Sequence, residues 1–272
     1  MTTDLPASLV LVGAGKMGGA MLEGWLAVGL DPAGAVVLDP APSDAVAALC
    51  RKTGLRLNPS EPVAPPQALV LAIKPQGLDE AAPGLAPLVG SDTLLVSILA
   101  GKTIADLRAR LPGARAVVRA MPNLPASVRR GATGAAASPE VTPAQKAAAH
   151  ALLSGVGIVE WLEGEHLVDA VTALSGSGPA YVFHLVECLA RAGAAAGLPQ
   201  DVAGRLARAT VAGAGELLAQ SDLPASTLRE NVTSKGGTTA AALEVLTAQP
   251  GLDDLMRRAV AAAKRRAQEL SG

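Results

Sequence analysis

Two glycine-rich stretches of the chain carry residue types that bind anions. Near the N-terminus, "LVLVGAGKMGGAML" places Gly13, Gly15 and Gly18 in a G-x-G-x-x-G spacing directly after an apolar run. This spacing provides a tight turn, a close approach of the backbone to a pyrophosphate, and close packing of the following helix. Free N–H groups at the start of that helix then bind the phosphates. We therefore predict that the first stretch binds a dinucleotide.

An acidic residue after the next predicted strand bears on which dinucleotide is bound. Asp39 stands where a carboxylate accepts hydrogen bonds from ribose hydroxyls, which favours NAD(H), because a carboxylate repels a 2′-phosphate. No arginine follows until Arg51, although Ser43 is able to reach a phosphate. Alternatively, Asp39 only begins the turn "DPAPSD", whose residues are typical of turns. The sequence leaves the choice between NADH and NADPH open.

The second stretch, "VTSKGGTTAAAL", interrupts the most helix-prone part of the chain. In a purely structural interpretation, Thr238 or Thr239 caps the following helix and the glycines end the preceding helix "PASTLREN". The same arrangement also makes an anion site, because the N–H groups of Gly237, Thr238 and Thr239 converge at a helix start. A small carboxylate would fit there, so we predict a substrate clamp.

Further candidates follow three other predicted strands, in "LAIKPQGL", "SILAGKT" and "RAMPNLP". In an open parallel sheet, loops at the carboxyl ends of strands line the ligand crevice. Lys74 in the first loop is able to reach a ribose or a carboxylate, but as an isolated feature it is more often a solvated lysine. Tyr181 and His184 suggest a general acid, but we favour the alternative in which both lie on an amphipathic helix as core and rim.

The elements that must position these residues change character along the chain. Up to about residue 160, β-branched runs alternate with helical stretches, which predicts a parallel sheet with helical crossovers. The predicted strands are Leu9–Val12, Val36–Leu38, Ala68–Ile73, Leu94–Ile98, Ala116–Ala120, Ala132–Ala137 and Ile158–Trp161. The predicted helices are Met17–Val28, Ser43–Lys52, Leu78–Leu88, Ile104–Leu111, Pro143–Leu153, Ala180–Ala196, Val202–Gln220, Thr239–Thr247 and Asp253–Leu270. We expect an α/β Rossmann-type domain over 1–163 and an all-α domain over 164–272.

Composition excludes several classes of protein. With 272 residues, 50% of them hydrophobic and 17% charged, the chain is able to bury a large core. A net charge of -1 gives no electrostatic footprint for nucleic acid or an anionic membrane, and neither is expected as a partner. Cys50 and Cys188 are too few for a disulfide framework, and no spacing of ligands predicts a metal. Without a signal peptide or a long apolar span, we expect a cytoplasmic protein.

These motifs, taken in order, resemble pyrroline-5-carboxylate reductase. The resemblance rests on "GAGKMG", "AIKPQ", "SILAG", "MPN", "SGSGPAY" and "VTSKGGTTAAAL", and the last is the most specific. It implies a Rossmann-type domain and a helical dimerisation domain, and therefore a homodimer or a higher homo-oligomer. It also implies reduction of (S)-1-pyrroline-5-carboxylate to L-proline with NADPH or NADH, the final step of proline biosynthesis.

The resemblance assigns roles to residues of this chain. Cofactor-binding candidates are Gly13, Gly15, Lys16, Met17, Gly18, Asp39, Ala72, Lys74, Pro75, Ala100 and Asn123. Substrate-binding candidates are Gly236, Gly237, Thr238, Asn231 and Asp222, with the Gly236–Thr238 backbone holding the carboxylate. The catalytic candidates are Thr239, whose hydroxyl is expected near the ring nitrogen, and Ser234.

One departure from the family keeps a second enzyme in view. Most members have proline where this chain has Lys235. A β-hydroxyacid dehydrogenase also joins a glycine-rich turn to a helical domain, and Lys235 would be its catalytic lysine. A third interpretation is a dinucleotide-binding module without catalysis, such as a redox-sensing regulator. The Gly-Gly-Thr-Thr run after Lys235 favours the reductase.

Overall fold

The structure is a computed structural model that describes residues 5–271, with side chains up to Leu270. The chain forms two compact units. The first contains the residues up to Gly176 and those from Ala263 onward, and the second is Ser177–Ala262. The outer ends of the predicted domains, residues 1 and 272, lie outside the described part of the chain.

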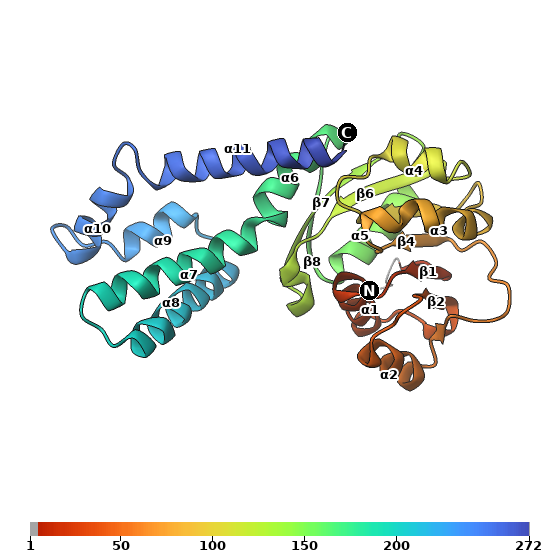
Figure 1. Cartoon of the computed structure of the whole chain (residues 1–272), viewed down its shortest axis with the longest axis horizontal. Helices are drawn as coiled ribbons and strands as arrows, with labels where there is room; N and C mark the ends of the chain where they lie inside the picture. Colours follow the sequence, from red (N-terminus) through yellow and green to blue (C-terminus); the bar gives the residue numbers. More distant parts are fainter. Residues whose placement is uncertain (1–4, 272) are drawn as a thin grey trace. The chain divides into compact units, whose positions relative to one another are not determined.

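A sheet of eight strands forms the centre of the first unit, in the order β3-β2-β1-β4-β5-β6-β7-β8 (Figure 1). The strands are β1 (Leu9–Val12), β2 (Ala35–Leu38), β3 (Arg56–Leu57), β4 (Ala68–Leu71), β5 (Leu94–Ser97), β6 (Ala116–Met121), β7 (Gly131–Ala137) and β8 (Gly157–Trp161). Neighbouring strands are parallel except β6 and β7, which run antiparallel with Val118 opposite Ala137. Central β1 places Val10 beside Val36 and Leu69. Winding in both directions from β1 is typical of dinucleotide-binding sheets.

Helices cover both faces of this sheet. The helices of the unit are α1 (Lys16–Ala27), α2 (Asp44–Thr53), α3 (Leu78–Leu85), α4 (Ile104–Arg110), α5 (Pro143–Ser154) and α6 (Val168–Val171). Because alternate residues of a strand face opposite sides, two apolar layers form, one against α1, α2 and α5 and the other against α3 and α4. In the first layer, the Trp25 indole N–H of α1 donates to the Leu152 carbonyl of α5 at 2.6 Å.

Short helical turns connect these elements and lie at the carboxyl ends of several strands. The 3₁₀ turns are Pro32–Gly34, Pro75–Gly77, Ala86–Leu88, Leu124–Val128 and Glu165–Leu167, and a π-helix spans Thr172–Gly176. Helix α4 begins with a capping box, in which Thr103 accepts from the Asp106 N–H and the Asp106 carboxylate accepts from the Thr103 N–H. This cap fixes the loop that leads from β5 into α4.

The second unit is entirely helical. It contains α7 (Gly178–Ala195), α8 (Gln200–Gln220), α9 (Ala225–Asn231), α10 (Thr238–Leu246) and the start of α11 (Leu252–Ser271). Helices α7 and α8 lie side by side (Figure 1). They approach closely where Gly193 faces Ala203, which is buried. No helix in the described residues is both long and apolar enough to cross a membrane.

The predicted fold class is confirmed, with several local corrections. The short strand β3 was not expected, and β7 is antiparallel to β6 although a parallel sheet was predicted. The predicted strand over 68–73 ends at Leu71, and the helix over 78–88 continues from Ala86 as a 3₁₀ turn. Helix α6 and the π-helix were also missed. They follow β8 within the first unit, so this unit extends beyond residue 163, where the strand signals end.

Candidate active site

The glycine-rich turn between β1 and α1 has the geometry that its spacing predicts. Gly13 has φ +87°, and a Cβ added there would lie 2.8 Å from the Ala72 carbonyl oxygen. A Cβ on Gly18 would overlap the Gly13 carbonyl oxygen. Gly15, by contrast, is exposed, and a Cβ there would meet only open space. Two glycines are therefore required by packing, while Gly15 leaves an open approach to the backbone.

The start of α1 is open to an anion. Gly15 is the N-cap, and no side chain caps the first N–H groups of the helix. Because these N–H groups have no partner within the helix and carry the positive end of its dipole, they favour a phosphate. The turn thus fits the pyrophosphate of a dinucleotide.

Asp39 connects this turn to the end of β2. Its Oδ2 accepts from the Ala14 N–H at 2.7 Å, and its Oδ1 accepts from the Ala41 N–H at 2.8 Å. The bond from the Ala41 N–H closes a local turn, as the turn interpretation of "DPAPSD" predicts. The bond from the Ala14 N–H holds the carboxylate beside the glycine-rich turn. The turn interpretation of Asp39 is confirmed, and the ribose contact stays a prediction.

A groove of about 460 Å³ lies beside the turn, and it brings together residues from α1, the β2–α2 loop and α2. Of the predicted cofactor residues, Gly15, Lys16 and Asp39 line it, and Ser43 of the β2–α2 loop lines it as well. Met17 and Gly18 are not among its lining residues. Met17 is half-buried against the apolar core, and Gly18 is held against Gly13.

The loops after β4 and β5 place the next predicted residues at the same edge of the sheet. Ala72 packs against the turn, 3.1 Å from the position of a Cβ on Gly18, and its N–H donates to the Val12 carbonyl. Lys74 is exposed ahead of the 3₁₀ turn that Pro75 begins. Ala100 is exposed beside Gly101, which has φ +71°.

Asn123 is buried, and its side chain joins separate segments. Its Nδ2 donates to the Ser175 carbonyl at 3.0 Å, and its Oδ1 accepts from the Ala132 N–H at 2.8 Å. Asn123 therefore fixes the π-helix against the loop after β6. π-helical turns are frequent at functional sites. Holding this π-helix is therefore a second role for Asn123, besides the predicted cofactor contact.

The stretch ahead of α10 in the second unit is an exposed turn that leads into an uncapped helix. Gly236 has φ +73°, and the Gly237 N–H donates to the Ser234 carbonyl at 3.0 Å. Gly237 is the N-cap of α10 and no side chain caps the helix, so the predicted capping by Thr238 or Thr239 is wrong. The glycines do not end α9 either, because α9 ends at Asn231. Free N–H groups therefore remain at the start of α10.

The remaining predicted side chains lie on the surface of the second unit. Asp222 and Asn231 are both exposed. On α7, the His184 Nδ1 lies 3.1 Å from a Glu187 carboxylate oxygen. This i,i+3 contact follows one face of the helix, which agrees with the amphipathic interpretation of His184.

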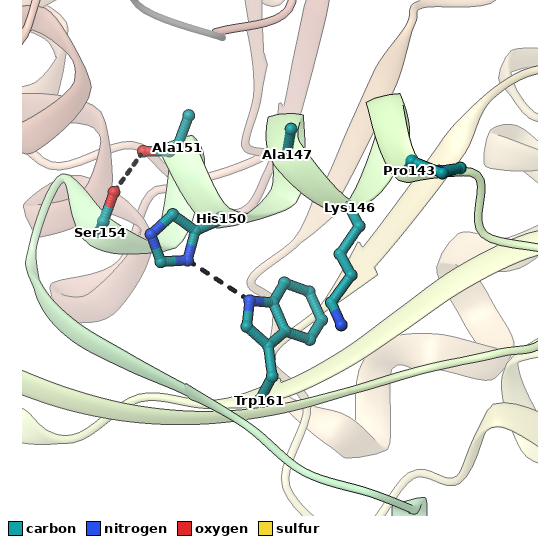
Figure 2. Close-up of a pocket in the computed structure, with 7 residues that line it drawn as sticks. All are labelled: Pro143, Lys146, Ala147, His150, Ala151, Ser154 and Trp161. Carbon is teal, nitrogen blue, oxygen red and sulfur yellow. Dashed lines mark hydrogen bonds between the residues drawn. The ribbon is translucent and has the colours of Figure 1, made fainter.

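A second groove, of about 480 Å³, lies on α5 and β8 and contains none of the predicted site residues. Figure 2 shows the Trp161 indole between Lys146 and His150. The Trp161 Nε1–H donates to His150 at 3.4 Å, and the Lys146 Nζ lies 4.6 Å from the ring centroid. These partners already satisfy the indole, so we assign the cluster a structural role.

Comparisons with known proteins decide the family. The family described as "Pyrroline-5-carboxylate reductase dimerisation" matches residues 165–270, and "NADP oxidoreductase coenzyme F420-dependent" matches residues 8–101. The chain is 39% identical to the pyrroline-5-carboxylate reductase of Pseudomonas aeruginosa over 265 residues, which are 97% of this chain and 96% of that relative. The chain belongs to the pyrroline-5-carboxylate reductase family.

Solved structures of this reductase family share the fold over the whole chain. The pyrroline-5-carboxylate reductase of Coxiella burnetii is 33% identical with a TM-score of 0.90, and the match covers 98% of this chain and 99% of that one. The pyrroline carboxylate reductase of Plasmodium falciparum, solved with NADP bound, is 26% identical with a TM-score of 0.77 and 98% coverage of both chains. The family membership supports the reductase interpretation. It gives no support to the two alternatives, a β-hydroxyacid dehydrogenase or a dinucleotide-binding module without catalysis.

One polar cluster of this reductase was missed from the sequence. Arg119 on β6 is 3% exposed, and its guanidinium pairs with Glu165 at 3.1 Å and Asp169 at 3.4 Å. Glu165 also accepts from the Ile104 N–H at the start of α4. The cluster therefore joins the β5–α4 loop to the segment before α6. An arginine inside the apolar run "AVVRAM" was the available signal.

Proposed function

We propose that the chain reduces (S)-1-pyrroline-5-carboxylate to L-proline by hydride transfer from NADH or NADPH. One observation carries the proposal: the chain is 39% identical to a pyrroline-5-carboxylate reductase over almost its whole length, and it has two helix starts without a side-chain cap that suit anions. The first of these anion-binding segments is the turn before α1, and the second is the turn before α10. A dinucleotide and a small carboxylate are the two anions that this reaction requires.

The first unit fits the cofactor. The open space over Gly15 accommodates a pyrophosphate, and the uncapped N–H groups of α1 are its donors. Asp39 is placed to accept from a ribose hydroxyl, because each carboxylate oxygen accepts more than one hydrogen bond. When bound, the nicotinamide supplies the hydride. The protein residues bind and orient it.

The second unit supplies the groups for the substrate. The N–H groups at the start of α10 bind the carboxylate, with the Gly236–Thr238 backbone around it. Thr239 donates or accepts a hydrogen bond at the ring nitrogen, and Ser234 supports the turn through its carbonyl. A protonated imine is already an electrophile, so its reduction needs orientation rather than a strong acid.

We also propose that the protein is a homodimer or a higher homo-oligomer. In the second unit, no residue of α7, α9 or α10 is buried, and in α8 only Ala203 and Ala207 are. Its helices expose large apolar side chains, among them Val182, Phe183, Leu185, Leu217, Leu218, Val245 and Leu246. Patches of this kind mark interaction sites, and a second copy of the dimerisation unit covers them. Because Cys50 and Cys188 are both free thiols, we place the protein in the reducing cytoplasm.

The test is cofactor oxidation with pyrroline-5-carboxylate, with NADH and NADPH run in parallel. We expect turnover with at least one cofactor. Thr239→Val should lower kcat by roughly 10- to 100-fold, because a hydrogen bond to a charged ring nitrogen is lost. Thr239→Ser retains the hydroxyl and should keep most of the wild-type kcat. Full turnover by Thr239→Val would remove Thr239 from this role. Binding of both cofactors without oxidation of either would overturn the reductase assignment.

A further inference from the structure

We propose that Asp39 makes this enzyme select NADH over NADPH. The inference rests on the proposed function, since it concerns the cofactor of the same reaction. It depends on how firmly Asp39 is held at the groove, and on how few hydrogen-bond donors the neighbouring loop offers to a 2′-phosphate.

The Asp39 carboxylate is fixed from two sides. The Ala14 N–H of the glycine-rich turn binds one oxygen at 2.7 Å, and the Ala41 N–H binds the other at 2.8 Å. Both bonds hold the carboxylate in one orientation at the groove. The remaining lone pairs accept from ribose hydroxyls, which are donors, whereas a 2′-phosphate brings only further negative charge.

The backbone of Asp39 is fixed as well. The Asp39 N–H donates to the Asn58 Oδ1 at 2.9 Å, and the Asn58 Nδ2 donates to the Asp39 carbonyl at 2.6 Å. Asn58 has φ +45°, a conformation that non-glycine residues rarely adopt and that persists only where other contacts hold it. The backbone of Asp39 is therefore unable to shift without breaking this pair of hydrogen bonds, and rotation of its side chain would break the bonds from Ala14 and Ala41.

The loop after Asp39 is poor in donors. Pro40 and Pro42 have no N–H group, and the Ala41 N–H is already given to Asp39. The Ser43 hydroxyl accepts from the Val46 N–H as the cap of α2, which leaves its own hydrogen and the Ser43 N–H for a ligand. A phosphate dianion bound here would be undercoordinated.

The charges around the loop also disfavour a phosphate. Asp44 adds a second carboxylate in the first turn of α2. Lys16 is the single cation among the lining residues of this groove, and Glu23 lines it as well. Lys16 is exposed, and a hydrated, flexible ammonium offsets a fixed carboxylate only in part. The balance at the groove favours a ribose with free hydroxyls.

The test compares kcat/KM for NADH and NADPH, and the dissociation constants of both cofactors measured without substrate. We expect the wild-type protein to favour NADH by about tenfold or more, because like charges at contact are strongly disfavoured. Asp39→Ser should move the ratio towards NADPH by at least the same factor. Asp44→Asn removes one charge from the first turn of α2 and is the matched control. It should shift the ratio towards NADPH far less than Asp39→Ser does, because Asp44 is not the carboxylate held at the glycine-rich turn.

Two results would overturn the inference: a wild-type preference for NADPH, or an unchanged ratio in Asp39→Ser. If the serine variant does not fold, Asp39→Asn takes its place, because it removes the charge and retains one acceptor oxygen. The wild-type ratio of kcat/KM for NADH and NADPH tests the inference in either case. Failure of the proposed function looks different. In that case pyrroline-5-carboxylate would oxidise neither cofactor, while the two dissociation constants would still show whether Asp39 discriminates between them.

Discussion

The two anion-binding segments differ in what surrounds their glycines at positive φ, Gly13 and Gly236. In the turn before α1, the space around Gly13 and Gly18 is filled by backbone atoms of the first unit. In the turn before α10, Gly236 has open space around it, and the segment is exposed. The first turn is therefore shaped by the core beneath it, whereas the second is held by local hydrogen bonds such as that from the Gly237 N–H to the Ser234 carbonyl. We infer that the cofactor site is preformed and that the substrate loop is adaptable.

The largest effect is expected when one methyl group is added to the glycine-rich turn before α1. Gly18→Ala should destabilise the protein by about 3 kcal/mol or more, because the new Cβ overlaps the Gly13 carbonyl and the backbone must move. Urea unfolding and NADH binding would measure it. Gly15→Ala is the control: its stability should stay within about 0.5 kcal/mol, while cofactor binding weakens. Normal NADH binding by Gly18→Ala would show that the turn is not preformed.

The next test concerns Asn58, which holds the edge of the cofactor site. Asn58→Ala should cost about 2 kcal/mol, because it removes two hydrogen bonds to Asp39 and places alanine, which tolerates positive φ less well than asparagine, at this position. Asn58→Gly relieves the backbone and should cost only about 1 kcal/mol. Both variants should lose cofactor discrimination alike, since both release Asp39. If only the alanine variant lost discrimination, backbone strain rather than the hydrogen bonds would be responsible.

In the substrate loop we expect a smaller effect. Gly236→Ala should cost about 1 kcal/mol of stability, since its φ of +73° suits glycine but the surrounding space is free. It should raise the KM for pyrroline-5-carboxylate and leave the dissociation constant of NADH unchanged. Steady-state kinetics and fluorescence titration separate the two. A weakened NADH affinity would contradict the division of labour between the turns.

The smallest effect concerns the cap of α4 in the first unit. Burial raises the pKa of Asp106, but hydrogen bonds from Thr103 and the charges of Lys102 and Arg110 outweigh it, and the net pKa is lowered. A lowered pKa means stability that is present above the ordinary carboxyl range and is lost as pH falls through the folded-state value. Asp106→Asn should therefore cost about 1 kcal/mol at pH 7. The difference from wild type should shrink in urea unfolding at acid pH, and a constant difference would contradict it.

The sequence predicted the strands well where apolar runs were bounded by turn residues, as for β1 and β5. It predicted the glycine roles too, because steric needs at Gly13 and Gly18 follow from the spacing alone. Prediction from the sequence failed where contacts between residues distant in the chain determine the structure. The antiparallel course of β7 depends on its pairing with β6, and the role of Arg119 depends on Glu165 and Asp169. Short-range hydroxyl capping was predicted before α10, but Gly237 occupies the N-cap instead. The roles of Thr239 and Ser234 stay predictions.

The course of α11 has a consequence for the order in which the protein assembles. This helix starts in the second unit, but its residues from Ala263 onward belong to the first. There Ala267 is buried, and the backbone of Leu270 lies close to Gly101 in the β5–α4 loop. During synthesis at about 5–20 residues per second, the sheet emerges long before this last segment. The cofactor-binding half is therefore completed late, only after the helical half has left the ribosome.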